Sequence, residues 1–148
     1  MLRRSTEAQV GVGLDWMYRK LIEHSKDFDY VVIVSCGNTI GIDHFRIADI
    51  ADILVQRFAR RHLVLYGGAS ELWHGIRPDF EELALNIRAW FEYAGVLCID
   101  GRKLYSQVAV TSADIDHANH FRGTSRDKAV QWLTAVVWSV FSENIRSG

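Results

Sequence analysis

The sequence has few of the residues that interrupt a fold, cross-link it or embed it in a membrane. Its 148 residues include one proline and two cysteines, and its most apolar late stretch, Trp132–Phe141, is too short to span a bilayer. Without low-complexity runs there is no obvious linker, and two cysteines do not make a disulfide framework. Cys36 and Cys98 both lie in apolar, strand-like segments. We therefore expect one globular domain spanning residues 1–148, with buried, reduced thiols.

The sequence also lacks an excess of charge of either sign. The formal net charge is −1 and the pI is about 6.6, which argues against a protein that binds nucleic acid by neutralising phosphates. Two arginines, Arg3 and Arg4, stand near the start, but the apolar segment of a signal peptide does not follow them. These features predict a cytoplasmic protein that binds neither nucleic acid nor membranes.

Strand-like and helical segments alternate along the chain. This pattern favours an α/β sandwich with a mostly parallel β-sheet covered by helices. Four consecutive β-branched residues, Val31 to Val34, are typical of a central strand that is covered on both faces. The predicted strands are Tyr30–Cys36, His62–Tyr66, Val96–Ile99 and Lys103–Thr111, and the predicted helices begin near Thr6, Asp43, Asp79 and Ser125, with Gly95 ending the third and Ile145 the last.

A second interpretation of the same segments is an α+β fold in which hairpins interleave with helices. Gly37-Asn38 and Gly67-Gly68 are hairpin signals, so short return strands could follow at 39–42 and 69–73. Asp100-Gly101 is a further turn signal between the last two predicted strands. We prefer the parallel sheet because the return segments alternate poorly between apolar and polar residues.

Polar side chains follow the first two predicted strands. In open α/β sheets, ligands bind outside the carboxyl ends of the strands. Asn38, with Thr39 beside it, is placed to donate to a developing oxyanion there, although a turn also favours asparagine. Ser70 and His74 occupy the loop after the second strand, where the alternative is an ordinary polar turn. We predict that these residues line one polar, ligand-binding edge.

Four potential metal ligands crowd the region before the last helix. Asp114, Asp116, His117 and His120 fall within seven positions, and such side chains suit zinc. Spacing of this kind is common by chance, however, and Asp114 and His117 alone form a different constellation. A histidine oriented by a carboxylate is a general base that needs only a nucleophile. We predict no required metal site and no cofactor.

The order of these motifs resembles the SGNH, or GDSL-type, hydrolase family. The resemblance rests on a strand followed by Cys36-Gly37-Asn38 and, much later, on Asp114-x-x-His117-Ala118-Asn119 before a final helix. That family has a Gly-x-Asn-Asp block and an Asp-x-x-His-Pro-Asn block in the same order. The resemblance implies that Asn38 is an oxyanion donor, His117 the base and Asp114 the residue that orients it.

The sequence also departs from the family pattern. Cys36 stands in place of a glycine, Thr39 in place of an aspartate and Ala118 in place of a proline, and no Gly-Asp-Ser block occurs. Two hypotheses follow. The first is a degenerate domain without a complete catalytic set, acting in small-molecule binding or self-association. The second is an esterase-like hydrolase that uses Asp114 and His117 with a nucleophile such as Ser35, Ser70 or one from another chain.

The last predicted helix is apolar on two sides. Trp138 and Ile145 point almost opposite to its main stripe of Ala129, Leu133, Val136, Val137 and Val140. An outward tryptophan is a common interface anchor, although another part of the chain could cover it equally well. We predict a homo-oligomer, most simply a homodimer, with Trp138 and Ile145 in the interface.

Overall fold

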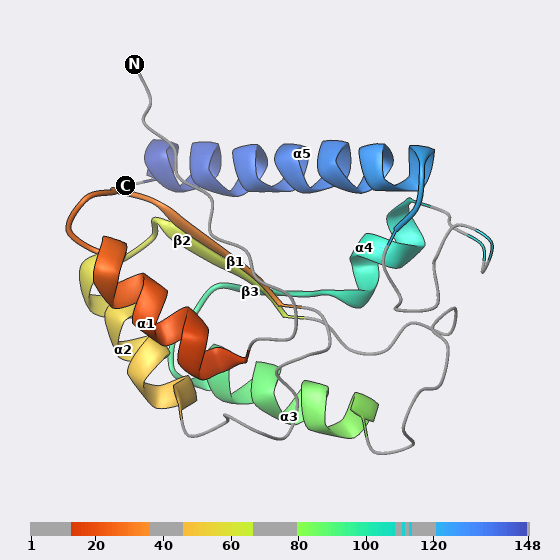
Figure 1. Cartoon of the computed structure of the whole chain (residues 1–148). Coiled ribbons are helices and arrows are strands. Elements are labelled where there is room, and N and C mark those ends of the chain that lie inside the picture. Colours follow the sequence, from red (N-terminus) through yellow and green to blue (C-terminus); the bar gives the residue numbers. More distant parts are fainter. Residues whose placement is uncertain are drawn as a thin grey trace.

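The computed structural model of the chain describes residues 13–35, 46–66, 80–108, 111, 113 and 121–147. Helices and strands alternate as the sequence predicts up to Asp100 (Figure 1). The elements are α1 (Leu14–His24), β1 (Val31–Ser35), α2 (Arg46–Arg57), β2 (His62–Tyr66), α3 (Phe80–Tyr93), β3 (Cys98–Asp100), α4 (Arg102–Gln107) and α5 (Thr124–Ser147).

The three described strands form a parallel sheet in the order β1-β2-β3. Each connection between them contains a helix, as parallel pairing requires, so the α/β class is confirmed. The register pairs Ser35 with Tyr66 and Tyr66 with Asp100. These three residues therefore end their strands in one row, which we call the carboxyl edge of the sheet.

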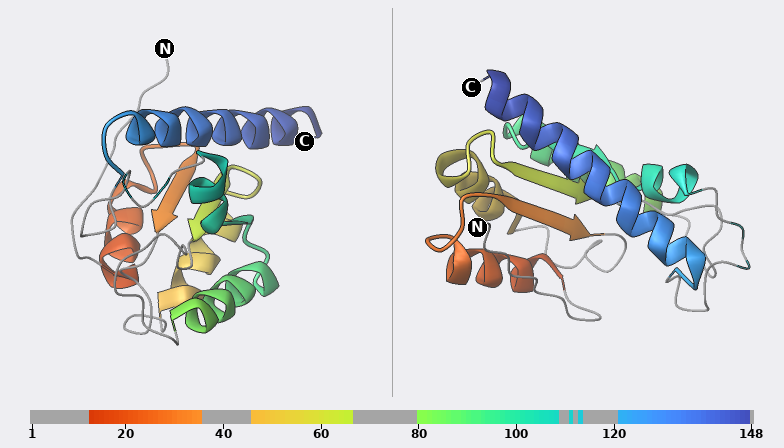
Figure 2. Two further views of the ribbon diagram at one scale, coloured as in Figure 1. Left: turned by 90° about the vertical axis from the view of Figure 1, so that its right-hand side faces the viewer. Right: turned by 90° about the horizontal axis from the view of Figure 1, so that it is seen from above.

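Helices cover both faces of this sheet (Figures 1 and 2). The helices α1, α2 and α3 lie on one face, and α4 and α5 lie on the other. The central strand β2 is buried along its whole length. Its side chains alternate, so that Val64 and Tyr66 join the core beneath α1–α3, whereas Leu65 joins the core beneath α4 and α5.

The two cores differ in size. The larger one also receives Val31, Ile33 and Cys98 from the sheet, and its buried members from the helices and the turns after them are Leu14, Leu21, Ile47, Ile50, Ala51, Leu54, Phe58, Ile87, Phe91 and Val96. Within the described part of the chain, the smaller one has Leu65, Leu104, Val108 and Ala129 as its buried members, with partly buried side chains around them. Among the described residues, no helix is both long and apolar enough to cross a membrane.

The predicted strand over residues 103–111 is wrong, because the chain forms α4 there. The backbone N–H of Arg102 donates to the Asp100 carboxylate, and Gly101 already has helical φ and ψ angles of −62° and −21°. Leu104 and Val108, four positions apart, are both buried in the smaller core. Tertiary burial along one face thus favours a helix over Arg102–Gln107, and Asp100-Gly101 leads into this helix instead of a hairpin.

Within the described sheet, the first strand does not have the predicted central position. Among the described strands β2 is central and β1 lies at the side of the sheet, where Val34 is 42% exposed. A continuous apolar run indicates where burial is expected but does not fix the order of strands. The helix end at Gly95 is confirmed by its φ of +90°. The possible return strands at 39–42 and 69–73, and the helix start near Thr6, lie outside the described residues.

Candidate functional site

The carboxyl edge of the sheet brings together polar side chains of α3, β3 and α4. The backbone N–H of Gly101 donates to the carbonyl of Tyr66 over 2.8 Å, which fixes the end of β3 beside the end of β2. The chain also leaves β1 at this edge, after Ser35. This is the position at which open α/β sheets bind ligands.

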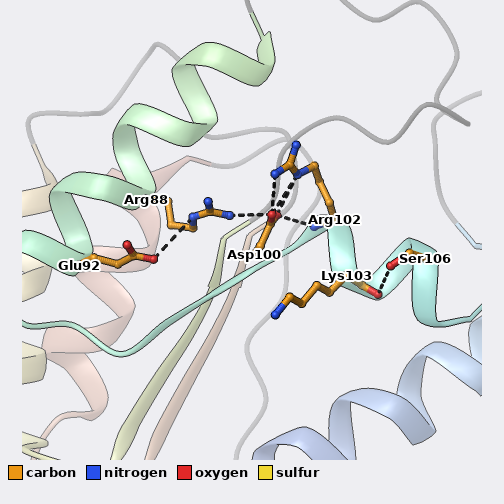
Figure 3. Close-up of polar contacts among 6 residues, drawn as sticks. All are labelled: Arg88, Glu92, Asp100, Arg102, Lys103 and Ser106. Atoms are coloured by element: carbon orange, nitrogen blue, oxygen red, sulfur yellow. Dashed lines mark hydrogen bonds and ion pairs between the residues drawn. The ribbon is translucent and has the colours of Figure 1, made fainter.

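Asp100 is the centre of a charged cluster at this edge (Figure 3). Its Oδ1 accepts hydrogen bonds from the Arg102 backbone N–H at 2.9 Å and from Arg102 Nε at 3.2 Å. Its Oδ2 accepts from Arg102 Nε at 3.0 Å and Nη2 at 2.8 Å, and from Arg88 Nη1 at 2.8 Å. Arg88 comes from α3 and Arg102 from α4, so one carboxylate joins helices that lie on opposite faces of the sheet.

The ionisation of Asp100 follows from these contacts. Burial of the carboxyl group by itself would raise its pKa, but the hydrogen bonds from Arg102 and Arg88 outweigh burial and lower the pKa to about 2. The group is therefore a permanent anion near neutral pH. A general acid or base needs a pKa closer to the working pH, so Asp100 serves here to orient cations and not to transfer protons.

Two further charged side chains border the cluster (Figure 3). Glu92 Oε1 lies 3.7 Å from Arg88 Nε, and its side chain is 53% exposed, so this ion pair is weak. Lys103 follows Arg102 on α4 and is exposed. The cations at this edge therefore outnumber the carboxylates among these five residues.

Cys98, two positions before Asp100, is a free thiol whose side chain packs against the larger core. Burial raises its pKa to about 12, and the negative charge of Glu92 adds to the shift. Since the thiolate is the nucleophilic form, Cys98 has a structural role, as expected for a buried, reduced cysteine.

The side chains for which the sequence predicts a chemical role lie in other segments of the chain. Asp114 and His117, and the other two potential metal ligands Asp116 and His120, lie outside the described residues. The predicted ligand-binding residues Asn38, Thr39, Ser70 and His74, together with Cys36, also lie outside them. The catalytic hypothesis and the predicted convergence of these segments therefore stay predictions.

The predicted interface residues lie on α5. Trp138 is 72% exposed, in agreement with its expected outward position, whereas Ala129 on the opposite stripe is 7% exposed. Ile145 belongs to α5, but its side chain lies outside those that the structure describes.

Sequence reasoning missed Arg88, Asp100 and Arg102 as a site. Asp100 was interpreted only as part of a turn, and Arg88 stands on an amphipathic helix like any other charged residue. One signal was present, because Asp100 directly follows an apolar strand at the end where ligands bind. The pairing of Asp100 with Arg88, twelve positions earlier, depends on tertiary structure.

Comparisons with protein-family models, curated proteins and solved structures found no match to this chain.

Proposed function

We propose that this chain is a degenerate SGNH-hydrolase-like domain that binds a small polar ligand at the carboxyl edge of its sheet and lacks a complete catalytic set. The observation that carries the proposal is the row of strand ends at Ser35, Tyr66 and Asp100. All three described strands run in the same direction and end there, so the chain leaves β1, β2 and β3 at the same edge of the sheet.

Two further observations favour binding over hydrolysis. The sequence has no Gly-Asp-Ser block to supply the nucleophile, and a base without a nucleophile does not carry out acyl transfer. Cys98, which lies two positions before Asp100 in β3, stays protonated near neutral pH because burial raises its pKa to about 12. The alternative function is an esterase-like hydrolase in which Asp114 and His117 act with another nucleophile, such as Ser35 or Ser70.

The test combines an ester assay with ligand screening. We expect no hydrolysis of a chromogenic short-chain ester above the buffer rate. We also expect some members of a library of small polar molecules to shift the amide NMR signals of Ile99, Asp100 and Gly101. Ester hydrolysis that disappears in a His117→Ala variant would instead establish the esterase, and a library that leaves all three amides unmoved would contradict binding at this edge.

Self-association is a second candidate function, favoured by the exposure of α5. Trp138 is 72% exposed and Val130 is 60% exposed on a helix whose opposite side packs on the sheet. Large apolar side chains in such positions are frequent anchors of protein interfaces. A homodimer would cover them. Light scattering, which gives the molecular mass in solution, tests this for the unmodified chain and for a Trp138→Asp variant.

A further inference from the structure

We propose that Arg88 and Arg102 form the recognition element for an anionic group, a carboxylate or a phosphate, on the ligand of the carboxyl edge. This inference rests on the proposed ligand-binding function and names the chemical class of the ligand. The paired guanidinium groups stand at the end of β3, on the side of the sheet where ligands of α/β folds bind (Figure 3).

The hydrogen bonds at Asp100 leave donor capacity in the cluster. The carboxylate accepts five hydrogen bonds, two at Oδ1 and three at Oδ2, which uses all of its acceptor capacity. A guanidinium group carries five N–H donors on three nitrogens. Within the described part of the chain, Arg88 engages Nη1 with Asp100 and Nε, at 3.7 Å, with Glu92. Its Nη2 donors therefore suit a further acceptor.

The charge and rigidity of the cluster point to the same class of ligand. Arg88, Arg102 and Lys103 are cationic. Among the described residues, Asp100 contacts both guanidinium groups, and Glu92 forms only a weak, exposed ion pair with Arg88. The Arg88 side chain is 21% exposed and that of Arg102 is 37% exposed. Both are thus accessible to a ligand while Asp100 holds them in place, which lowers the entropy lost on binding.

The planar fork of a guanidinium group favours carboxylates and phosphates over other anions. Both groups offer oxygen pairs that match two parallel N–H donors, and these charge-assisted bonds are stronger than neutral ones. Asp100 itself illustrates the geometry, because Arg102 binds its two oxygens through Nε and Nη2. A ligand carboxylate or phosphate would accept hydrogen bonds from the Nη2 donors of Arg88.

The experiment is a titration of the full chain with sodium phosphate and, separately, sodium acetate, each against sodium chloride at equal ionic strength. The readout is the NMR signal of the arginine Nε–H groups and of the backbone amides. We expect saturable shifts at Arg88 and Arg102 with at least one of the two oxyanions, at a dissociation constant on the order of 1 mM for so small a probe. Chloride should give no saturable shift. The two arms distinguish a phosphate from a carboxylate preference.

Three variants sharpen the titration. Arg88→Gln should weaken binding at least tenfold, and Arg88→Lys, which keeps the charge but loses the fork, should weaken it severalfold. Arg102→Gln provides a second, independent loss in case Arg88→Gln disturbs the packing of α3, and thermal unfolding identifies any variant that does not fold. Lys128→Gln removes one positive charge, as Arg88→Gln does, but from an exposed position on α5. This variant should bind the oxyanions like the unmodified chain.

Each contrary outcome has a definite meaning. Shifts that fail to saturate, or saturable binding that none of the arginine variants weakens, would overturn the anion site. If neutral polar molecules shift the amides of Ile99 and Gly101 while both oxyanions leave the arginine signals unchanged, the anion inference fails and the proposed ligand-binding function stands. If neither class of molecule moves any signal at this edge, both proposals fail.

Discussion

On the face of the sheet beneath α1–α3, helices and strands interlock so closely that Leu14, Leu54 and Phe91 are each at most 1% exposed. The opposite face is covered by α4 and by α5, which is 24 residues long. Among the described side chains of α5, only Ser125 and Ala129 are buried. The sheet is therefore covered on both faces, but it is densely packed on only one.

The path of α5 explains this difference. Figure 2 shows α5 crossing the strands obliquely, so that only part of its length overlies the sheet. Its apolar stripe of Leu133, Val136, Val137 and Val140 is accordingly half-buried. Because hydrophobic stabilisation scales with the area removed from water, we expect the α1–α3 face to dominate the stability of the fold. The α5 face retains apolar surface that is available for contacts with other molecules.

The largest expected effect is the truncation of a buried leucine on the densely packed face. Leu54→Ala, at a position that is 0% exposed, should lower the free energy of unfolding by about 2–5 kcal/mol, because it creates a cavity that the core cannot fill. Leu133→Ala on α5 should cost only about 1–2 kcal/mol, because that side chain is only partly buried. Urea denaturation followed by circular dichroism measures both values. Equal losses at the two positions would refute the difference between the faces.

The next effect concerns a buried histidine that ties three elements together. Leu97 N–H donates to His62 Nε2 at 2.9 Å, so Nδ1 carries the hydrogen that bonds the Phe58 carbonyl at 2.8 Å. His62→Leu would leave the Leu97 N–H without its acceptor, while the Phe58 carbonyl would keep its bond from the Arg61 N–H at 2.8 Å. The change should therefore cost about 1–3 kcal/mol of unfolding free energy.

Thr134→Ala is the matched control for this change on the α5 face. It also removes a side-chain hydrogen bond, from Thr134 Oγ1 to the Val130 carbonyl, but at an exposed position, and it should change the stability by less than about 0.5 kcal/mol. Denaturation of both variants under the same conditions provides the comparison. A His62→Leu variant as stable as Thr134→Ala would mean that water replaces the lost bonds.

A smaller effect is expected at Asp100, which connects the two faces through Arg88 and Arg102. Its pKa is lowered from 3.8 to about 2 in the folded chain, so its contribution is complete above about pH 4 and is lost as the pH falls towards 2. Asp100→Asn should therefore cost about 1–2 kcal/mol at pH 7, after allowance for its partial exposure. Unfolding curves of the Asp100→Asn variant and of the unmodified chain, recorded at pH 7, 4 and 3, should become more alike as the pH falls. A gap between the two that is constant with pH would show that the charge of Asp100 contributes nothing.

The sequence predicted the fold where the evidence is local. Each correct signal is contained in the short segment whose structure it predicts. These signals are the apolar stripes of the helices, the glycine at position 95 and the buried run His62–Tyr66. The α/β class followed from their alternation. The parts that it predicted wrongly depend on contacts distant in sequence. The helix α4 is favoured by the burial of Leu104 and Val108 beneath α5, in addition to the local bond from the Arg102 N–H to the Asp100 carboxylate. The order of strands depends on which neighbours pair.

The same distinction applies to the candidate site. The spacing of Asp114 and His117 is visible in the sequence because both belong to one short segment, and it remains a prediction. The Asp100 cluster could not be recognised in that way. Its members come from α3, β3 and α4, and only folding brings Arg88 within 2.8 Å of Asp100. An aspartate directly after an apolar predicted strand was the one available sign.

The smallest expected effect on stability, and the sharpest test of the α5 face, is Trp138→Asp. Because this side chain is 72% exposed, its replacement should change the unfolding free energy of the monomer by less than about 0.5 kcal/mol. If α5 forms a homodimer interface, a buried aspartate would oppose association strongly. Light scattering at about 50 µM, where a dimer of micromolar affinity is well populated, should give a dimer mass for the unmodified chain and about 16.9 kDa for the variant. Ser139→Asp, at the adjacent exposed position, adds the same charge and should stay dimeric.

A monomeric unmodified chain at this concentration would refute self-association. If both variants lost the dimer, the added negative charge, and not the loss of the tryptophan, would explain the dissociation.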